Sequence, residues 1–119
     1  TTPSQTPLLY EKDIRPGTHI TAMGSDTPEK QELDTAILAK ADWVVADSLS
    51  QSKSRGEIFK ALSAGAVKES SILELGNVIR EPSKIDRSRD HISVADLTGV
   101  AVQDIQIVTA VCRMLKQTP

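Results

Sequence analysis

Short apolar segments punctuate the chain and end abruptly in glycine, serine or aspartate. They cover residues 18–23, 43–48 and 91–99 and are rich in β-branched side chains. The continuous apolar run that opens residues 43–48 is typical of a strand that is buried on both faces of a parallel sheet. We therefore predict three strands at these positions.

Apolar residues at helical spacing occupy the stretches between and after these segments. Residues 32–41 show this spacing around Asp34, which is suited to cap a helix N-terminus. Residues 52–65 show it again up to Gly65, a typical residue just beyond a helix end. The longest helix is predicted for residues 100–117, where the apolar stripe is clearest.

Two further stretches complete the predicted fold. Residues 70–79 fit either a strand or a short helix, and we favour a helix of about two turns. Residues 81–91 are charged and rich in turn residues, so we expect an exposed loop. The alternation of strands and helices predicts an α/β fold with a parallel sheet and right-handed crossovers. The final helix is more apolar than three strands can cover, so we expect it to pack on a missing partner.

Composition excludes several classes of partner. Aromatic residues make up 3% of the chain and the formal charge is −2, which argues against base stacking and against a basic nucleic-acid surface. No segment approaches about 18 consecutive apolar residues, so no membrane span is expected. The first ten residues lack the pattern of a signal peptide.

Cysteine and histidine add little chemistry. Cys112 is the single cysteine, so no internal disulfide is possible and a cytoplasmic, reducing location is expected. We expect Cys112 to be a small buried hydrophobic residue rather than a nucleophile. His19 and His91 have no second ligand at suitable spacing, so no metal site is predicted.

Two strand ends carry candidate ligand-binding residues. Residues 24–26 (Gly-Ser-Asp) follow the first predicted strand, and residues 96–99 (Asp-Leu-Thr-Gly) end the third. In an open parallel sheet, ligands bind beyond the carboxyl ends of the strands. Each segment combines a glycine, a carboxylate and a hydroxyl. Because these are also common turn residues, a structural role is the more frequent outcome for either segment taken alone.

Lys30 follows the first of these segments, near the start of a predicted helix, where a cation does not suit the helix dipole. It either meets an anionic group or is an ordinary surface lysine. The chain has no G-x-S-x-G motif, and its six glycines are never two residues apart, so the dinucleotide motif G-x-G-x-x-G is absent.

Five ordered segments resemble the ornithine cyclodeaminase/mu-crystallin family. The resemblance extends from Thr1 to about Arg113, and the segment that contains VADLTGVAVQDI resembles cyclodeaminase-like and ectoine-utilisation branches of that family. The segments are TTPSQTPLL, RPGTHITAMGSDTPEKQELD, VVADSLSQSKSRGE, ELGNVI and ISVADLTGVAVQDI.

The resemblance implies an enzyme that uses NAD or NADP and acts on an amino or imino acid. It implies the C-terminal half of a Rossmann-like parallel sheet with flanking helices and a long C-terminal helix. Residues 1–99 would belong to the NAD(P)-binding domain, and residues 100–119 would pack on an N-terminal dimerisation and substrate domain. The full-length protein would be a homodimer. This chain alone would be inactive, because the glycine turn and the substrate-binding arginines lie outside it.

The resemblance also implies a reaction and its alternatives. Ornithine would be converted to proline and ammonia by internal hydride transfer, or a related imine would be reduced or an amino acid dehydrogenated. A non-catalytic binding protein like mu-crystallin, or a free-standing interaction module, are the alternatives.

Residue roles follow from the same resemblance. Asp26 matches the catalytic, proton-transferring aspartate and would contact both cofactor and substrate. Thr98 matches a substrate contact. Leu97 stands where the cyclodeaminase has a serine, so only its backbone can contact the cofactor. Thr2, rather than Thr1, matches a cofactor-contacting loop. The residues that the resemblance assigns to cofactor binding are Thr2, Met23, Gly24, Ser25, Asp26, Lys30 and Leu97.

Overall fold

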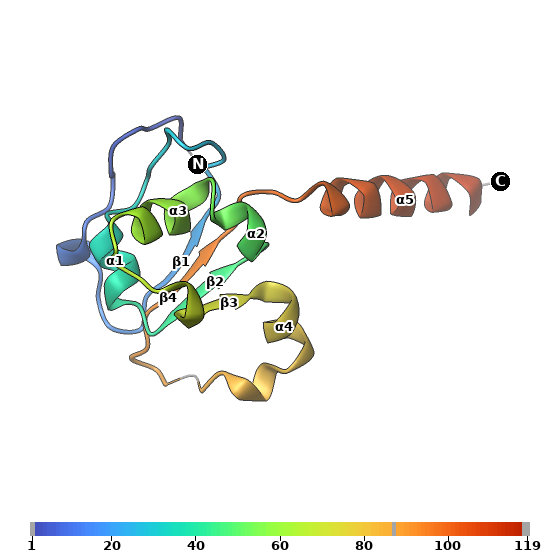
Figure 1. The fold of residues 1–119 in the computed structure, drawn as a ribbon. Coiled ribbons are helices and arrows are strands. Elements are labelled where there is room, and N and C mark those ends of the chain that lie inside the picture. Colours follow the sequence, from blue (N-terminus) through green and yellow to red (C-terminus); the bar gives the residue numbers. More distant parts are fainter. Residues whose placement is uncertain (1, 87, 118–119) are drawn as a thin grey trace.

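A four-stranded parallel sheet forms the centre of the computed structural model, which describes residues 2–86 and 88–117 (Figure 1). The strand order is β1-β4-β2-β3, so β4 pairs with both β1 and β2. The α/β parallel fold predicted from the sequence is therefore confirmed. The strands are β1 (His19–Ala22), β2 (Trp43–Ala46), β3 (Ile72–Glu74) and β4 (Ser93–Asp96).

Three helices cover one face of the sheet: α1 (Thr35–Lys40), α2 (Leu49–Ser52) and α3 (Gly56–Ser63) (Figure 1). The core lies between these helices and the sheet, where Ile37, Ile58 and Val94 are completely buried. Alternate strand residues point into this core because side-chain direction reverses at each strand residue.

Local signals define the helix ends. Asp34 caps α1 as predicted, since its side chain accepts a hydrogen bond from the Ala36 amide at 2.9 Å. Gly65 follows α3 with φ +69°, the conformation expected of a glycine just beyond a helix end. Short 3-10 turns cover Glu11–Asp13, Glu69–Ser71 and Pro82–Lys84.

The prediction for residues 70–79 is wrong in part. Strand β3 occupies Ile72–Glu74, and only the following α4 (Leu75–Arg80) is helical. Ile72 and Leu73 pair with Val44 and Val45 of β2, so the sheet has four strands rather than three. Pairing with a strand far away in sequence outweighs the local helical preference.

Helix α5 (Ala101–Gln117) projects away from the sheet (Figure 1). Its apolar side chains are exposed along its length, including Ile105, Val111 and Leu115. Cys112 is exposed on the same helix, so the prediction of a buried thiol is wrong. The reason is that the described body of the chain does not cover α5. Among the described residues no helix is long and apolar enough to cross a membrane.

Gly56 allows α3 to begin directly beside β4. Its φ is +91°, and a Cβ atom at this position would lie 2.5 Å from the Asp96 Oδ2 atom and 2.7 Å from the Thr98 Cγ2 atom. Gly65 also has a positive φ, but nothing lies within 4 Å of the corresponding position. Substitution at Gly65 would therefore meet backbone strain alone, whereas substitution at Gly56 would meet backbone strain and a steric conflict.

We predict that Gly56→Ala lowers the free energy of unfolding more than Gly65→Ala. Gly65→Ala is the control and should lower the free energy of unfolding by about 1–2 kcal/mol from backbone strain alone. Gly56→Ala should lower it further, because Asp96 and Thr98 must also move. Urea unfolding followed by circular dichroism measures both variants. Equal losses would show that the contact with Asp96 does not constrain residue 56.

Candidate active site

The two strand-end segments predicted to carry chemistry lie side by side. β1 and β4 are neighbours in register, with Ala22 opposite Asp96. The Leu97 amide then donates to the Ala22 carbonyl at 2.9 Å. Residues 24–26 and 97–99 consequently leave the sheet at the same carboxyl edge, which is where ligands bind in open parallel sheets.

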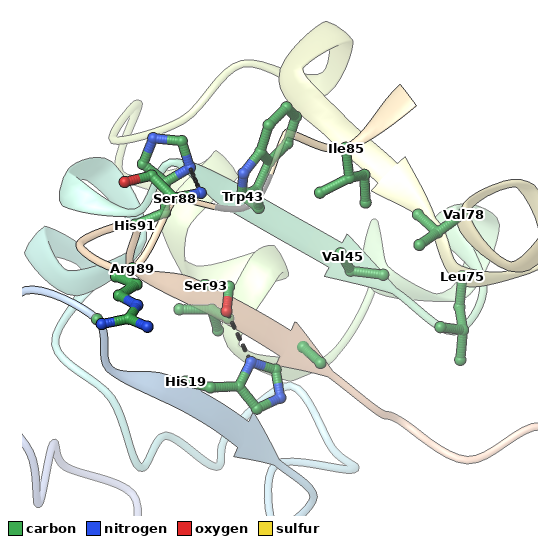
Figure 2. Close-up of a pocket in the computed structure, with 13 residues that line it drawn as sticks. His19, Trp43, Val45, Leu75, Val78, Ile85, Ser88, Arg89, His91 and Ser93 are labelled. Carbon is green, nitrogen blue, oxygen red and sulfur yellow. Dashed lines mark hydrogen bonds between the residues drawn. The ribbon is translucent and has the colours of Figure 1, made fainter. Parts of the chain in front are cut away.

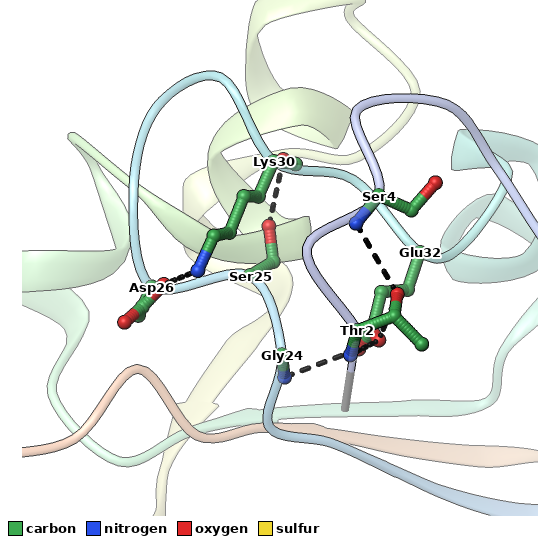
Figure 3. A network of polar contacts seen from close by, with 7 residues as sticks. All are labelled: Thr2, Ser4, Gly24, Ser25, Asp26, Lys30 and Glu32. Atoms are coloured by element: carbon green, nitrogen blue, oxygen red, sulfur yellow. Dashed lines mark hydrogen bonds and ion pairs between the residues drawn. The ribbon is translucent and has the colours of Figure 1, made fainter.

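Asp26 and Lys30 form an ion pair in the turn after β1 (Figure 3). The Lys30 Nζ atom lies 2.6 Å from the Asp26 Oδ1 atom, and the Ser25 hydroxyl donates to the Lys30 carbonyl at 2.7 Å. The hydrogen bond from Lys30 holds the pKa of the exposed Asp26 carboxyl below its usual value. Lys30 therefore contacts a carboxylate of its own turn, and its contact with an anionic group of a cofactor stays a prediction.

Glu32 joins the start of the chain to the turn after β1 (Figure 3). Its buried carboxylate accepts hydrogen bonds from the Gly24 amide at 3.1 Å and from the Thr2 hydroxyl at 2.9 Å. Burial acts to raise the pKa of Glu32, but the hydrogen bonds from Thr2 outweigh it and lower the pKa. Thr2 and Gly24, both predicted to contact the cofactor, are thereby held by one side chain.

The same carboxylate explains why residue 24 is glycine. A Cβ atom at Gly24 would collide with the carboxyl group of Glu32. Sequence reasoning assigned Gly24 to close ligand approach and gave Glu32 no role. The sequence signal that could have suggested a role for Glu32 is its position directly before the apolar residue Leu33, and both residues are buried in the structure.

Two more buried carboxylates accept hydrogen bonds from backbone amides near this edge. Glu57 accepts from the backbone amides of Glu32 at 2.7 Å and Leu33 at 3.1 Å, and burial raises its pKa. Asp96 accepts from the Ile58 amide at 2.8 Å. This amide lies in the first turn of α3, where helix donors lack intrahelical partners. Asp96 is thus a structural anchor for α3 within the candidate segment 96–99.

Burial also raises the pKa of Asp96, to about 7. The hydrogen bond from Ile58 opposes this shift, whereas the nearby charges of Glu57 and Asp47 add to it.

Asp47 holds the end of β4. It accepts from the Gly99 amide at 2.9 Å and from the Thr98 hydroxyl at 3.2 Å. Thr98, the predicted substrate contact, is buried with its hydroxyl directed to Asp47. The Leu97 amide is used within the sheet, so a backbone contact of Leu97 with a cofactor falls to its carbonyl. Met23 presents an exposed side chain.

The arrangement offers an exposed carboxylate on a firmly held edge, at the position where a Rossmann-like sheet meets its ligand. The class of protein that this fold and edge define is a Rossmann-like α/β protein. Residues 1–118 match the model of the ornithine cyclodeaminase/mu-crystallin family, and the chain belongs to that family.

Relatives of this chain include enzymes with solved structures. It is 46% identical over 111 residues to an uncharacterised cyclodeaminase of Sinorhizobium fredii, covering 92% of this chain and 33% of the relative. The iminosuccinate reductase of Paracoccus denitrificans in complex with NAD+ superposes with a TM-score of 0.85 at 39% identity, covering 97% of this chain and 35% of that one.

An archaeal alanine dehydrogenase dimer with bound NAD gives a TM-score of 0.84 at 40% identity, covering 92% of this chain and 34% of that one. The chain therefore spans about a third of the length of these relatives. The superpositions show that this chain matches a Rossmann-like part of the family's structures.

We predict that Asp96 makes stability depend on pH. Its pKa is raised in the folded state, so its contribution is most favourable below pH 4, falls as the pH rises from about 4 to about 7, and is constant above that. Asp96→Asn keeps an oxygen acceptor for the Ile58 amide and should flatten this decline. Asp104→Asn on the exposed helix α5 is the control and should keep it. Urea unfolding between pH 4 and 8 measures all three proteins, and an unchanged slope in Asp96→Asn would contradict the prediction.

Proposed function

We propose that this chain is the nicotinamide-side part of an NAD(P)-dependent enzyme that interconverts amino and imino acids. The observation that carries the proposal is Asp26, an exposed carboxylate held at the carboxyl edge of β1 beside the end of β4. Two relatives that superpose closely on this chain are a reductase of an imino acid and a dehydrogenase of an amino acid, each with NAD bound. Their cofactor supports the same cofactor here.

Asp26 would exchange a proton with the nitrogen of the substrate. The Lys30 ion pair keeps its carboxylate ionised, and therefore able to accept a proton from a substrate ammonium group. That ammonium group could take the place of Lys30 on the carboxylate, because both are cations that donate hydrogen bonds. Loss of this proton leaves the nitrogen lone pair that an imine requires.

The cofactor would supply the hydride acceptor or donor. The residues proposed to hold its nicotinamide end lie at one edge, and the hydrogen bonds that Thr2 and Gly24 donate to Glu32 fix these two relative to each other. The sequence lacks the glycine turn that receives a pyrophosphate, so these residues fit the nicotinamide end alone. This cofactor set is Thr2, Met23, Gly24, Ser25, Asp26, Lys30 and Leu97, with Thr98 and Asp26 contacting the substrate.

Among the reactions of the family, we propose imine reduction or amino-acid dehydrogenation ahead of ornithine cyclisation. Leu97 replaces the serine of the cyclodeaminase, and two relatives carry out chemistry on acyclic amino or imino acids. Conversion of ornithine to proline, which is the lyase reaction, and a place in the ectoine-utilisation branch stay predictions. So does a cytoplasmic location.

The proposed organisation of the whole protein places residues 1–99 in the cofactor domain. Residues 100–119 would pack on a dimerisation and substrate domain. The exposed apolar face of α5 supports this division, and the dimeric state of the alanine dehydrogenase relative supports a homodimer. This chain alone would then be inactive, because it carries only the nicotinamide side of the site.

A non-catalytic binding protein is the second candidate. One observation favours it: Asp26 is neutralised by Lys30 and its lowered pKa makes it a weak base. The exposed helix α5 likewise suits an interaction module. Ligand affinity without turnover across a panel of amino acids would support the binding protein over the enzyme.

We predict that Asp26→Asn in the full-length protein lowers turnover at least about 100-fold and lowers NAD(P) affinity far less, because asparagine keeps the shape of the side chain and one of its oxygens. Initial rates of NAD(P)H formation with amino acids, and fluorescence titration with NADH, measure the two quantities. Glu29→Gln is the matched control, since Glu29 is an exposed carboxylate of the same turn. Unchanged turnover in Asp26→Asn would remove Asp26 from the mechanism.

A further inference from the structure

Arg55 places a second cation at the carboxyl edge of the sheet. It directly precedes α3, and its Nη2 atom donates to the Gln51 side-chain oxygen and lies 3.5 Å from the Gly99 carbonyl oxygen. Gly99 follows Thr98 at the end of β4. The guanidinium group therefore lies beside the segment proposed to contact the substrate.

Within the described part of the chain, this guanidinium has no carboxylate in direct contact. It is half-buried, its Nε atom is shielded from solvent, and that atom has no hydrogen-bond partner. Among the described residues, no carboxylate forms an ion pair with it. Both of its acceptors are neutral oxygens. Shielding a charge without a paired anion costs free energy, which an incoming anion would recover.

The buried or half-buried acidic side chains near this edge bond backbone amides and not Arg55. Asp47 accepts from the Gly99 amide, Glu57 from the Glu32 and Leu33 amides, and Asp96 from the Ile58 amide. Each carboxylate satisfies backbone donors of a loop or helix end. Arg55 thus has no carboxylate partner at this edge within the residues that the structure describes. Its Nη2 atom is used by Gln51 and Gly99, so the Nη1 group is the part of the guanidinium that can donate charge-assisted hydrogen bonds to an incoming carboxylate.

Asp26 relates Arg55 to the proposed reaction. The positive charge of Arg55 contributes to the lowered pKa of Asp26, behind the direct hydrogen bond from Lys30. Among the described residues, Lys30 forms an ion pair with Asp26 at 2.6 Å and Arg55 forms none, so the guanidinium lies further from the Asp26 carboxylate than the Lys30 ammonium does. The α-carboxylate of a substrate is two bonds from its nitrogen and would stay near Asp26. An anion at Arg55 suits a group further along the substrate.

We propose that Arg55 binds the side-chain carboxylate of the substrate and so selects a dicarboxylic amino or imino acid. This inference rests on the proposed function, because it places the substrate nitrogen at Asp26. Arg55 would act on specificity and not on proton transfer.

Reductive amination by the full-length protein tests the assignment. Ammonium condenses with oxaloacetate to an imino dicarboxylate and with pyruvate to an imino monocarboxylate, each with loss of water, and NADH oxidation reports reduction of either. We expect Arg55→Gln to lower kcat/KM for oxaloacetate about 10–100-fold, mainly through KM, and to leave kcat/KM for pyruvate within about threefold. Arg55→Lys should recover part of the loss.

Lys53→Gln is the matched control, because Lys53 is a nearby cation that pairs with Glu69 at 2.7 Å. It should leave both substrates unchanged. Equal losses for both substrates in Arg55→Gln would reduce Arg55 to a structural role, and no loss for either would exclude the contact.

A binding measurement on this chain keeps the inference separate from the proposed function. We expect the NMR signal of the Arg55 Nε–H group to shift on titration with succinate and to shift less with propionate at the same concentration. Inorganic phosphate is the third arm: a stronger response to phosphate than to succinate would overturn the carboxylate assignment, as would no response to succinate. Wild-type protein that oxidises no NADH with either keto acid would contradict the proposed function, while the succinate titration would still decide the role of Arg55.

Discussion

Hydrogen bonds that backbone amides donate to buried carboxylates hold the carboxyl edge of this sheet together. Asp96 accepts from an amide in the first turn of α3, and Glu57 accepts from an amide just before α1. Glu32 accepts from an amide in the turn after β1. Helix ends and loops have unpaired donors that must be bonded when they are buried. Because each carboxylate joins two segments distant in sequence, the edge has a defined shape before any ligand binds.

This use of acidic residues determines which charges remain for function. The buried carboxylates are occupied by amides, so the ionisable groups that stay available at this edge are exposed or half-buried. Asp26 and Lys30 neutralise each other in the turn after β1, and Arg55 has no anionic partner among the described residues. On the proposals made above, the amine of a ligand would meet Asp26 and a ligand carboxylate would meet Arg55.

Patterns local to the chain predicted much of this arrangement. Residue spacing and the rules of parallel sheets predicted the Asp34 cap, the strands within 43–48 and 91–99, and the convergence of two strand ends. Strand β3 was missed because its identity depends on pairing with β2. The roles of Glu32 and Asp96 were missed because each side chain bonds an amide in another segment. Glu32 bonds the Gly24 amide, 8 positions away, and Asp96 bonds the Ile58 amide, 38 positions away. No local pattern encodes such contacts.

Amide hydrogen exchange followed by NMR tests the central claim most directly, namely that these carboxylates bond the loop and helix-end amides. The amides to compare are those of Gly24, Leu33, Ile58 and Gly99 against Val102 in the first turn of the exposed helix α5. Protection well above that of Val102 at all four positions is the predicted result. Exchange as fast as at Val102 would contradict the claim, because it would show that the amides are open to water.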